Sequence, residues 1–401
     1  MMPKLKIENL TLIFGREQQE ALQMLQQGQS KADILERTGA TVGVKNASFE
    51  IEKGEFFVIM GLSGSGKSSL LRCLNRLIEP SAGKVLLNNV DITALADADL
   101  QKVRRKEIAM VFQKFGLLPH RSVLENVAFG LELQGMPAEE RLEKARNVIE
   151  LVGLKGYENM MPAELSGGMQ QRVGLARALA NEPEVLLMDE AFSALDPLIR
   201  TQMQDELLDL QEKMHKTIVF ITHDLDEAIR LGDRIAIMKD GEVIQIGTPE
   251  EILTAPANEY VSSFVEKVDR KAIITASSLM DTKPTTAVFR KDGPEGSLRK
   301  MRATGLKILP AVTVDKHFLG FVYLHEVLEV KQRGDKTIEA VIHRDVPVAH
   351  PDTTVEQMLP FIAETDKPVA VVNPANNKLL GLISQTSLII ETTGSQTNPQ
   401  A

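Results

Sequence analysis

A glycine-rich loop that begins at residue 61 limits the possible folds of this chain more than any other stretch. The loop reads Gly61-Leu62-Ser63-Gly64-Ser65-Gly66-Lys67-Ser68-Ser69. An apolar, partly β-branched segment before it (56–60) predicts a buried strand, and residues 69–74 after it predict the first turns of a helix. In this context the backbone N–H groups of the loop and the positive end of the helix converge on a polyphosphate. Lys67 would add a mobile positive charge, and Ser68 would add a hydroxyl for Mg²⁺.

Short apolar runs alternate with helical stretches over residues 1–268. The runs are 85–87, 108–112, 185–188, 217–221 and 234–238. This alternation predicts an α/β domain whose sheet is largely parallel and buried on both faces. Residues 100–181 are mostly helical in pattern and predict a helical subdomain set into the sheet domain. Residues 16–41 predict a helical insertion whose second helix ends at Gly39.

The last third of the chain contains an internal repeat, which follows a short helix expected at 261–268. Gly320 and Gly381 lie 61 residues apart in two similar apolar segments, 309–322 and 368–383. This period suits a strand-turn-strand unit with two helices, stacked twice. We therefore expect a paired α+β module at residues 272–393, followed by a disordered tail at 394–401.

The charge of the chain is unevenly distributed. Residues 270–401 carry 16 Lys and Arg against 14 Asp and Glu, a net charge of +2, which leaves 30 against 41, or −11, for residues 1–269. The net negative charge of residues 1–269 disfavours a nucleic-acid-binding ATPase, because such proteins more often carry a basic face. No apolar run approaches the ~18 residues that span a bilayer, and the N-terminus lacks the apolar core of a signal peptide. These features predict a cytoplasmic protein.

Polar residues follow several of the predicted strands. Asp189 and Glu190 end one of them. The first carboxylate could hold Mg²⁺ through water, and the second is placed where a base would orient an attacking water. Gln113 and His223 each follow another strand. Each motif could be structural by itself, and the glycine loop could be a turn without a ligand, but their combination favours a phosphate site.

A second helix start offers another anion site. The segment Leu165-Ser166-Gly167-Gly168-Met169-Gln170 places small residues ahead of a predicted helix. The positive end of a helix attracts anions. One chain thus contains two phosphate-binding helix ends, which suggests that each nucleotide is clamped between two copies.

Taken in order, these motifs resemble those of the ATP-binding subunit of an ABC transporter. The matching motifs are Walker A (Gly61 to Ser68), the Q-loop Gln113, the signature (Leu165 to Gln170, with Met169 where the family usually has Gln), Walker B (Val185 to Glu190), the D-loop Asp196 and the switch His223. The resemblance implies an ABC-type P-loop ATPase domain at residues 1–268 that hydrolyses ATP with Mg²⁺.

The same resemblance implies a head-to-tail homodimer and a role for each motif residue. It implies nucleotide contacts from Phe14, Gly61, Ser63, Gly64, Ser65, Gly66, Lys67, Ser68, Ser69, Ser166, Gly167, Gly168 and Asp196. Ser166 and Gly168 would close on the γ-phosphate that the other copy holds, and Phe14 would stack on adenine. Metal contacts would come from Ser68, Gln113 and Asp189. Glu190 would act as the general base, with His223 and Gln113 as the other catalytic groups.

A narrower set of features resembles the glycine betaine/proline importer ATPases of the OpuA type. These features are the insertion at 16–41, the segments 75–80 and 188–200, the Leu-Ser-Gly-Gly-Met signature and the repeat in the tail. The resemblance implies that the tail is a tandem CBS pair (about 272–333 and 334–393). In such importers these pairs are associated with sensing ionic strength and, in some members, with binding cyclic di-AMP.

The tail departs from the nucleotide-binding CBS pattern, in which an Asp lies three residues after a Thr or Ser. The equivalent pairs here are Tyr323 with Glu326 and Ser384 with Ser387. Binding of plain AMP is therefore not expected, and a spacer without a ligand stays open as an alternative.

The resemblance also implies partners and a location. The chain would be peripheral to the cytoplasmic face of the cell membrane. There it would bind two integral-membrane permease subunits, which work with a fused or separate substrate-binding protein, and it would bind no nucleic acid. The solute would be of the glycine betaine/proline type, taken up for osmoprotection. Two alternatives stay open: an importer for another small solute such as an amino acid, and a soluble ABC ATPase without a transport role.

Overall fold

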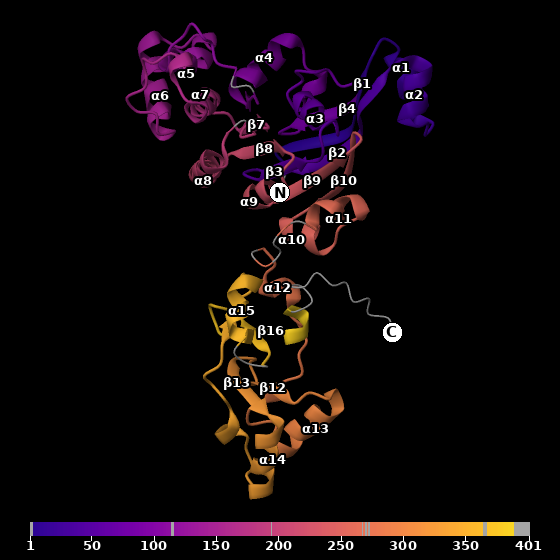
Figure 1. Cartoon of the computed structure of the whole chain (residues 1–401), viewed down its shortest axis with the longest axis vertical. Helices are drawn as coiled ribbons and strands as arrows, with labels where there is room; N and C mark the ends of the chain where they lie inside the picture. The colour runs from indigo at the N-terminus through magenta and orange to yellow at the C-terminus, as the bar shows by residue number, and fades with distance from the viewer. Residues whose placement is uncertain are drawn as a thin grey trace. The chain divides into compact units, whose positions relative to one another are not determined.

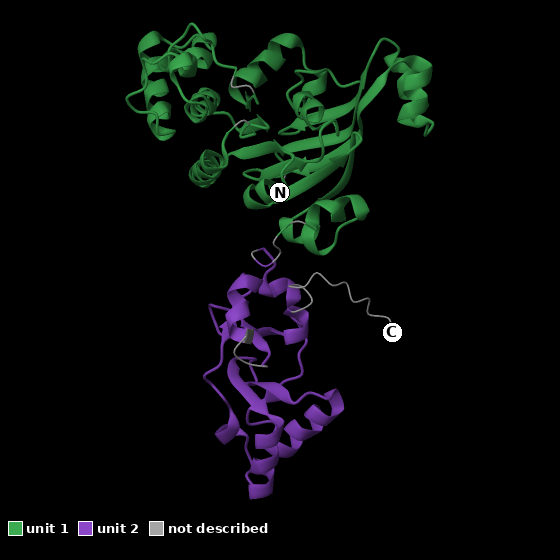
Figure 2. Cartoon of the chain, in the orientation of Figure 1, with its two compact units in different colours: residues 1–268 green, residues 269–401 purple. Residues whose placement is uncertain are grey.

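The computed structural model describes residues 3–113, 116–193, 195–266, 268, 271, 273–363 and 367–388. The predicted tail at 394–401 lies outside the described residues. The chain divides into two compact units, residues 1–268 (unit 1) and residues 269–401 (unit 2), as Figure 2 shows. Each unit has a hydrophobic core of its own.

Unit 1 combines two sheets with helices (Figure 1). Its strands are β1 (Leu5–Phe14), β2 (Thr41–Ile51), β3 (Phe56–Met60), β4 (Ala82–Leu87), β5 (Val90–Asp91), β6 (Ile108–Val111), β7 (Val185–Asp189), β8 (Thr217–Thr222), β9 (Arg234–Lys239) and β10 (Glu242–Gly247). Its helices are α1 (Gln18–Gln26), α2 (Lys31–Thr38), α3 (Lys67–Leu74), α4 (Asp97–Lys106), α5 (Val123–Leu133), α6 (Ala138–Leu151), α7 (Gly167–Leu179), α8 (Pro197–Met214), α9 (Leu225–Leu231), α10 (Pro249–Thr254) and α11 (Glu259–Val265), with short 3₁₀ turns η1 (Ile92–Ala94) and η2 (Pro162–Glu164).

The larger sheet of unit 1 has the strand order β10-β9-β3-β8-β7-β6. The pairs β9/β3, β3/β8, β8/β7 and β7/β6 are parallel, and β10 pairs antiparallel with β9. Every residue of β3, β7 and β8 is buried, as expected for parallel strands covered on both faces. The predicted α/β sheet is confirmed in these strands.

The smaller sheet of unit 1 is antiparallel, with the order β2-β1-β4-β5. It contains residues 85–87, so the prediction that this run joins the parallel sheet is wrong. Val85 and Leu87 belong to β4, which pairs antiparallel with β1. A short apolar run reveals a buried strand, but it does not reveal the direction of its partner. The two sheets share one hydrophobic core with α3.

The helices between residues 97 and 179 fall into two groups. α5, α6 and α7 pack against one another, whereas α4 packs on β6. The strand β6 therefore interrupts the predicted helical region at 100–181, and the helical subdomain consists of α5 to α7.

The helical insertion joins β1 to β2. Ala21, Met24 and Leu25 of α1 are buried with Ile34 of α2. Ser30 and Asp33 form a capping box at the start of α2, and Gly39 ends that helix with φ of 65°. The left-handed backbone at this position is the usual reason for a glycine at a helix end.

Unit 2 consists of two repeats with the same strand pattern. Its elements are α12 (Ala276–Leu279), β11 (Ala287–Val288), α13 (Pro294–Thr304), β12 (Ile308–Val312), β13 (Phe318–Tyr323), α14 (Leu324–Arg333), η4 (Glu339–Val341), β14 (Val348–Ala349), α15 (Val355–Ala363), β15 (Val369–Val372) and β16 (Leu379–Ile383). In each repeat a short strand pairs parallel with the next one, which continues into an antiparallel hairpin. Ile274 and Ala276 belong to the core of the second repeat, so the start of unit 2 packs with its last strands.

No helix among the residues that the structure describes is long and apolar enough to cross a bilayer.

Candidate nucleotide-binding and hydrolysis site

The glycine loop connects β3 to α3 in a conformation that other residues would strain. Gly61, Gly64 and Gly66 have φ values of 151°, 82° and 98°. A Cβ atom on Gly61 would lie 2.2 Å from the carbonyl oxygen of Met238, and one on Gly66 would lie 2.3 Å from that of Gly43. The loop therefore needs glycine both for its left-handed backbone and for its close neighbours.

Lys67, the first residue of α3, is buried beneath the loop. Its Nζ donates hydrogen bonds to the carbonyl oxygens of Gly61 (2.9 Å) and Leu62 (3.0 Å). Burial lowers the pKa of Lys67, and the nearby carboxylates of Glu190 and Asp189 oppose this shift. A buried ammonium whose hydrogen bonds within the described residues go to carbonyl oxygens is suited to meet a phosphate, because an anion would compensate its charge.

Two oxygen-bearing side chains face each other beside the loop. The Ser68 hydroxyl donates to Asp189 Oδ1 at 2.7 Å, and Arg72 donates to Asp189 Oδ2 at 3.2 Å. The buried hydroxyl of Ser65, within the loop, has no hydrogen-bond partner among the described residues. A hydroxyl and a carboxylate are the hard ligands that Mg²⁺ prefers, so this pair fits a magnesium ion.

The other predicted loop residues lie around these groups. Ser63 and Gly64 are exposed at the tip of the loop, and Ser69 is half-buried on α3.

The polar residues at the ends of β6, β7 and β8 converge on one edge of the parallel sheet. Gln113 Nε2 donates to Glu190 Oε2 at 3.1 Å and lies 3.4 Å from Ser193 Oγ. His223 Nδ1 lies 3.7 Å from Glu190 Oε2. Glu190 has a φ of 45°, which is rare for a residue with a side chain. The structure thus brings together the three residues predicted for catalysis, beside Lys67 and Asp189.

The predicted signature residues lie at the start of α7, outside this edge. Ser166 caps α7 by accepting a hydrogen bond from the Met169 backbone at 3.3 Å. A Cβ on Gly168 would lie 2.9 Å from Ile199 Cγ2, whereas one on Gly167 would have more room. Across the described residues, no hydrogen bond or ion pair joins the signature to the glycine loop.

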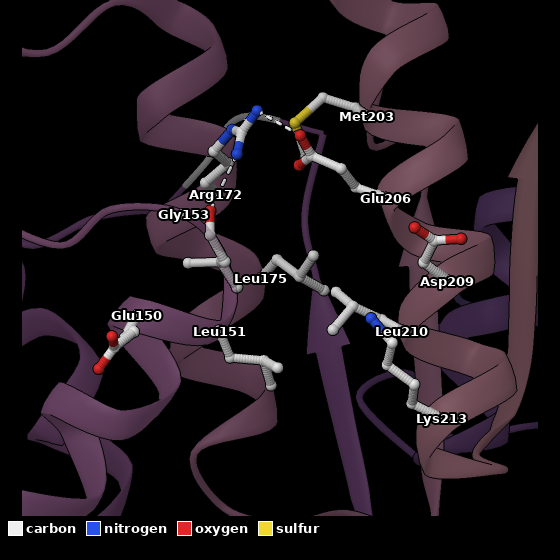
Figure 3. A pocket seen from close by; sticks show the side chains of 11 residues that line it. Glu150, Leu151, Gly153, Arg172, Leu175, Met203, Glu206, Asp209, Leu210 and Lys213 are labelled. Atoms are coloured by element: carbon white, nitrogen blue, oxygen red, sulfur yellow. Dashed lines mark hydrogen bonds and ion pairs between the residues drawn. The ribbon is translucent and has the colours of Figure 1, made fainter.

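Arg172 holds the signature helix against its neighbours. Its guanidinium donates to the carbonyl oxygen of Val152 (3.0 Å) at the end of α6 and to Glu206 Oε1 (2.6 Å) on α8. Figure 3 shows this fork at one end of a pocket between the helices. Asp196 caps α8 by accepting from the Ile199 backbone at 3.1 Å. The signature, the D-loop and α8 are therefore linked within one chain.

Phe14, predicted to stack on adenine, ends β1 and is 41% exposed. A Cβ on Gly43 would lie 2.7 Å from its ring, so the ring lies flush against β2. The strand β2 supports one side of the Phe14 ring, and the exposed part of the ring could stack on a planar ligand.

Two contributors were missed by the sequence reasoning. Arg72 binds Asp189, and Ser193 binds the backbone carbonyl of Glu190 at 3.0 Å. The position of Arg72 on α3 gave no signal, because an Arg in an amphipathic helix usually lies on its solvated face. Ser193 lies in the segment 188–200, whose sequence shows a resemblance but gives this residue no role of its own.

Comparison with known proteins adds independent findings. A family model described as "ABC transporter" matches residues 44–193, and one described as "CBS domain" matches residues 338–392. The chain is 52% identical over 400 residues to the glycine betaine/carnitine transport ATP-binding protein GbuA of Listeria monocytogenes, with 100% of both chains covered. It is 49% identical over 386 residues to the glycine betaine transport ATP-binding protein OpuAA of Bacillus subtilis, covering 96% of this chain and 91% of the relative.

A solved structure resembles about three fifths of this chain. MJ0796, described as a bacterial ABC transporter cassette, is known as a dimer and as a dimeric post-hydrolysis state bound to ADP and Pi. It is 36% identical to this chain with a TM-score of 0.52, and the match covers 61% of this chain and 98% of MJ0796.

Proposed function

The chain belongs to the family of ATP-binding subunits of glycine betaine ABC transporters, and from this premise we propose that it powers the uptake of a glycine betaine-type solute by hydrolysing MgATP between two copies of itself. The observation that carries the proposal is the sheet edge where Asp189 binds Ser68 and Glu190 binds Gln113, close to the buried Lys67. That edge offers a cation for the phosphates, a carboxylate for the metal and a second carboxylate for water.

Phosphate binding rests on the loop and on Lys67. The N–H groups of the loop and the start of α3 would receive the β- and γ-phosphates, and Lys67 would exchange its carbonyl partners for phosphate oxygens. Ser68 and Asp189 would hold Mg²⁺, with Gln113 as a further ligand; when bound, the ion would neutralise phosphate charge. The Ser68–Asp189 hydrogen bond would then open to admit the ion.

Hydrolysis requires a base near the γ-phosphate. Glu190 is 20% exposed in its side chain and hydrogen-bonded by Gln113, so its carboxylate is held yet reachable by a water. It would accept the proton of the attacking water, and His223 would contact the γ-phosphate from the next strand. The positive φ of Glu190 supports this assignment, because unusual backbone at a strand end re-aims a side chain toward a site.

Dimerisation would complete the site. In the part of the chain that the structure describes, the signature residues make no hydrogen bond or ion pair to the glycine loop, and Ser166 and Gly167 are exposed. In a head-to-tail dimer they would present the start of α7 to the γ-phosphate held by the other copy, and Asp196 would lie at the same interface. The dimeric state of MJ0796 supports this arrangement.

A trapped complex tests the dimer. Glu190→Gln with MgATP should run as a dimer in size-exclusion chromatography with light scattering, and wild type with ADP should return to monomer. A monomer under both conditions, even with the permease present, would contradict the proposal.

Transport requires a membrane partner. We infer that two copies bind two integral-membrane permease subunits at the cytoplasmic face, on the side of unit 1 near Gln113, and that the solute is selected by the permease and its binding protein. The test is ATP-dependent uptake by proteoliposomes that contain the whole transporter. We expect labelled glycine betaine to accumulate, and uptake of an amino acid such as methionine instead would favour the alternative importer.

Unit 2 is proposed to regulate this activity as a tandem CBS pair. The CBS model covers the second repeat, and the first repeat has the same strand pattern. The positions that correspond to the nucleotide-binding CBS pattern differ between the repeats: Glu326 of the first repeat binds His343 at 2.8 Å, whereas Ser384 and Ser387 of the second bind each other at 2.8 Å.

The regulatory signal would be ionic strength or a cyclic dinucleotide, and one experiment separates them. Uptake by the full transporter is measured against salt concentration and against cyclic di-AMP, with and without residues 272–401. Deletion should preserve uptake and abolish the response to one signal. Unchanged responses to both would favour the spacer alternative.

A further inference from the structure

Helix α11 touches the start of the glycine loop through Tyr260. The Tyr260 hydroxyl donates to the carbonyl oxygen of Met238 at 3.2 Å and accepts from the backbone nitrogen of Leu62 at 3.5 Å. Met238 lies on β9, and its carbonyl group abuts Gly61. One side chain from the end of unit 1 thus joins β9 to the first peptide of the loop.

The ring of Tyr260 is held by its surroundings. Lys239 Nζ lies 4.8 Å from the ring centroid, and the Phe264 ring meets it edge-on at 5.1 Å and 89°. Asn258 caps α11 by accepting from the Val261 backbone at 3.1 Å. Burial raises the pKa of Tyr260, so the phenol keeps the proton that it donates to Met238. These contacts point the hydroxyl in one direction.

The contact with Leu62 bears directly on Lys67. The nitrogen of Leu62 and the carbonyl group of Gly61 belong to one planar peptide. Its N–H group is bound by Tyr260, and its carbonyl oxygen is bound by Lys67 Nζ at 2.9 Å. A rotation of this peptide would therefore break both bonds. Tyr260 also lines a groove of about 660 Å³ together with Leu62 and His223, so it shares a surface with a predicted catalytic group.

We propose that Tyr260 is a positioning residue for nucleotide binding, which orients the Gly61–Leu62 peptide and thereby the place where Lys67 meets the polyphosphate. The inference rests on the proposed function of the glycine loop. Tyr260 touches no reacting atom. Its loss should weaken ground-state binding more than it slows the chemical step.

The test compares Tyr260→Phe, which removes only the hydroxyl, with Ser263→Ala, which removes a hydroxyl from the same helix without touching the loop. Ser263 is exposed, and among the described residues its hydroxyl donates to the Tyr260 carbonyl oxygen, at 2.7 Å. In the full-length chain, titration with a fluorescent ATP analogue should show about threefold to tenfold weaker binding for Tyr260→Phe, the effect of one lost hydrogen bond. The KM for MgATP should rise similarly, with kcat changed less than about twofold. Ser263→Ala should match wild type.

Equal nucleotide affinity of Tyr260→Phe and wild type would overturn the inference. If wild type itself failed to bind the analogue, the proposed function would fail instead. Amide hydrogen exchange of Tyr260→Phe tests whether the variant is folded like wild type. Faster exchange confined to residues 58–66 supports the proposal, and faster exchange throughout unit 1 would overturn it.

Discussion

The glycine-loop edge and the start of α7 are both suited to an anion, but they differ in what surrounds them. At the edge, Ser68, Asp189 and Arg72 are joined by hydrogen bonds, and Lys67 is buried beneath the loop. At the start of α7, Ser166 is exposed and its hydroxyl accepts a hydrogen bond from the backbone of its own helix. The edge holds side-chain charges of both signs, whereas the start of α7 offers a cap and small residues. This difference supports the proposal that the edge binds a nucleotide by itself and that the start of α7 contacts a nucleotide held by the other copy.

The largest effect should follow from Glu190→Gln, which removes the proposed base from the edge. Loss of a general base lowers kcat by about 10²–10⁴-fold, and nucleotide affinity should stay because Lys67 and Ser68 remain. Steady-state phosphate release and binding of a fluorescent ATP analogue measure the two quantities. Glu212→Gln, on the exposed side of α8, is the control. Undiminished phosphate release would remove Glu190 from the base role.

Lys67→Ala should weaken nucleotide binding itself. Removing a cation that meets phosphate is expected to cost about tenfold to a hundredfold in affinity, as for a charge-assisted hydrogen bond. Lys300→Ala is the matched control, since Lys300 Nζ also donates to a backbone carbonyl at 2.9 Å, but in unit 2. Equal affinities of the two variants would show that the edge does not bind the phosphates.

Ser166→Ala should separate the two regions most clearly. Binding of nucleotide to the monomer should be unchanged, whereas turnover should fall by about tenfold because one hydrogen bond to the γ-phosphate is lost. Ser122→Ala controls for the lost helix cap, since Ser122 also accepts a backbone hydrogen bond at 3.3 Å, at the start of α5. An equal loss of turnover in both variants would show that Ser166 acts as a helix cap and not as a contact to the γ-phosphate.

The smallest effect concerns a buried hydrogen bond that joins α8 to α9. Gln204 on α8 donates to Glu227 Oε1 on α9 at 2.9 Å. Burial raises the pKa of Glu227, and hydrogen bonds from Thr222 and Gln204 oppose this shift. A carboxyl whose pKa is raised on folding binds its proton more tightly in the folded state, so its ionisation lowers stability as pH rises from the unfolded to the folded pKa.

Glu227→Gln should therefore be at least as stable as wild type at neutral pH, and the difference should shrink on acidification. The difference in stability is measured by comparing the thermal unfolding midpoints of the two proteins from neutral pH down to the unfolded-state pKa of a glutamate. A difference that grows on acidification would contradict the assignment.

Much of the candidate site could be predicted because its signals are local. Glycines at 61, 64 and 66, a Lys at the start of a helix and acids after an apolar run each depend on a few consecutive residues. The helical insertion could be located for the same reason, since the spacing of Ala21, Met24 and Leu25 and the stop at Gly39 are local. The strand at 85–87 was assigned to the wrong sheet because its partner, β1, lies about 80 residues earlier in the chain.

The sequence by itself determined which residue types stand at the ends of strands and helices, because strand and helix periods and glycine conformations act over a few residues. Only the tertiary structure decided which of those ends meet. Ser68 and Asp189 are 121 residues apart in sequence, and Leu62 and Tyr260 are 198 apart. Such pairs form when strands align in one sheet and helices pack on it, and no pattern in either segment specifies its distant partner.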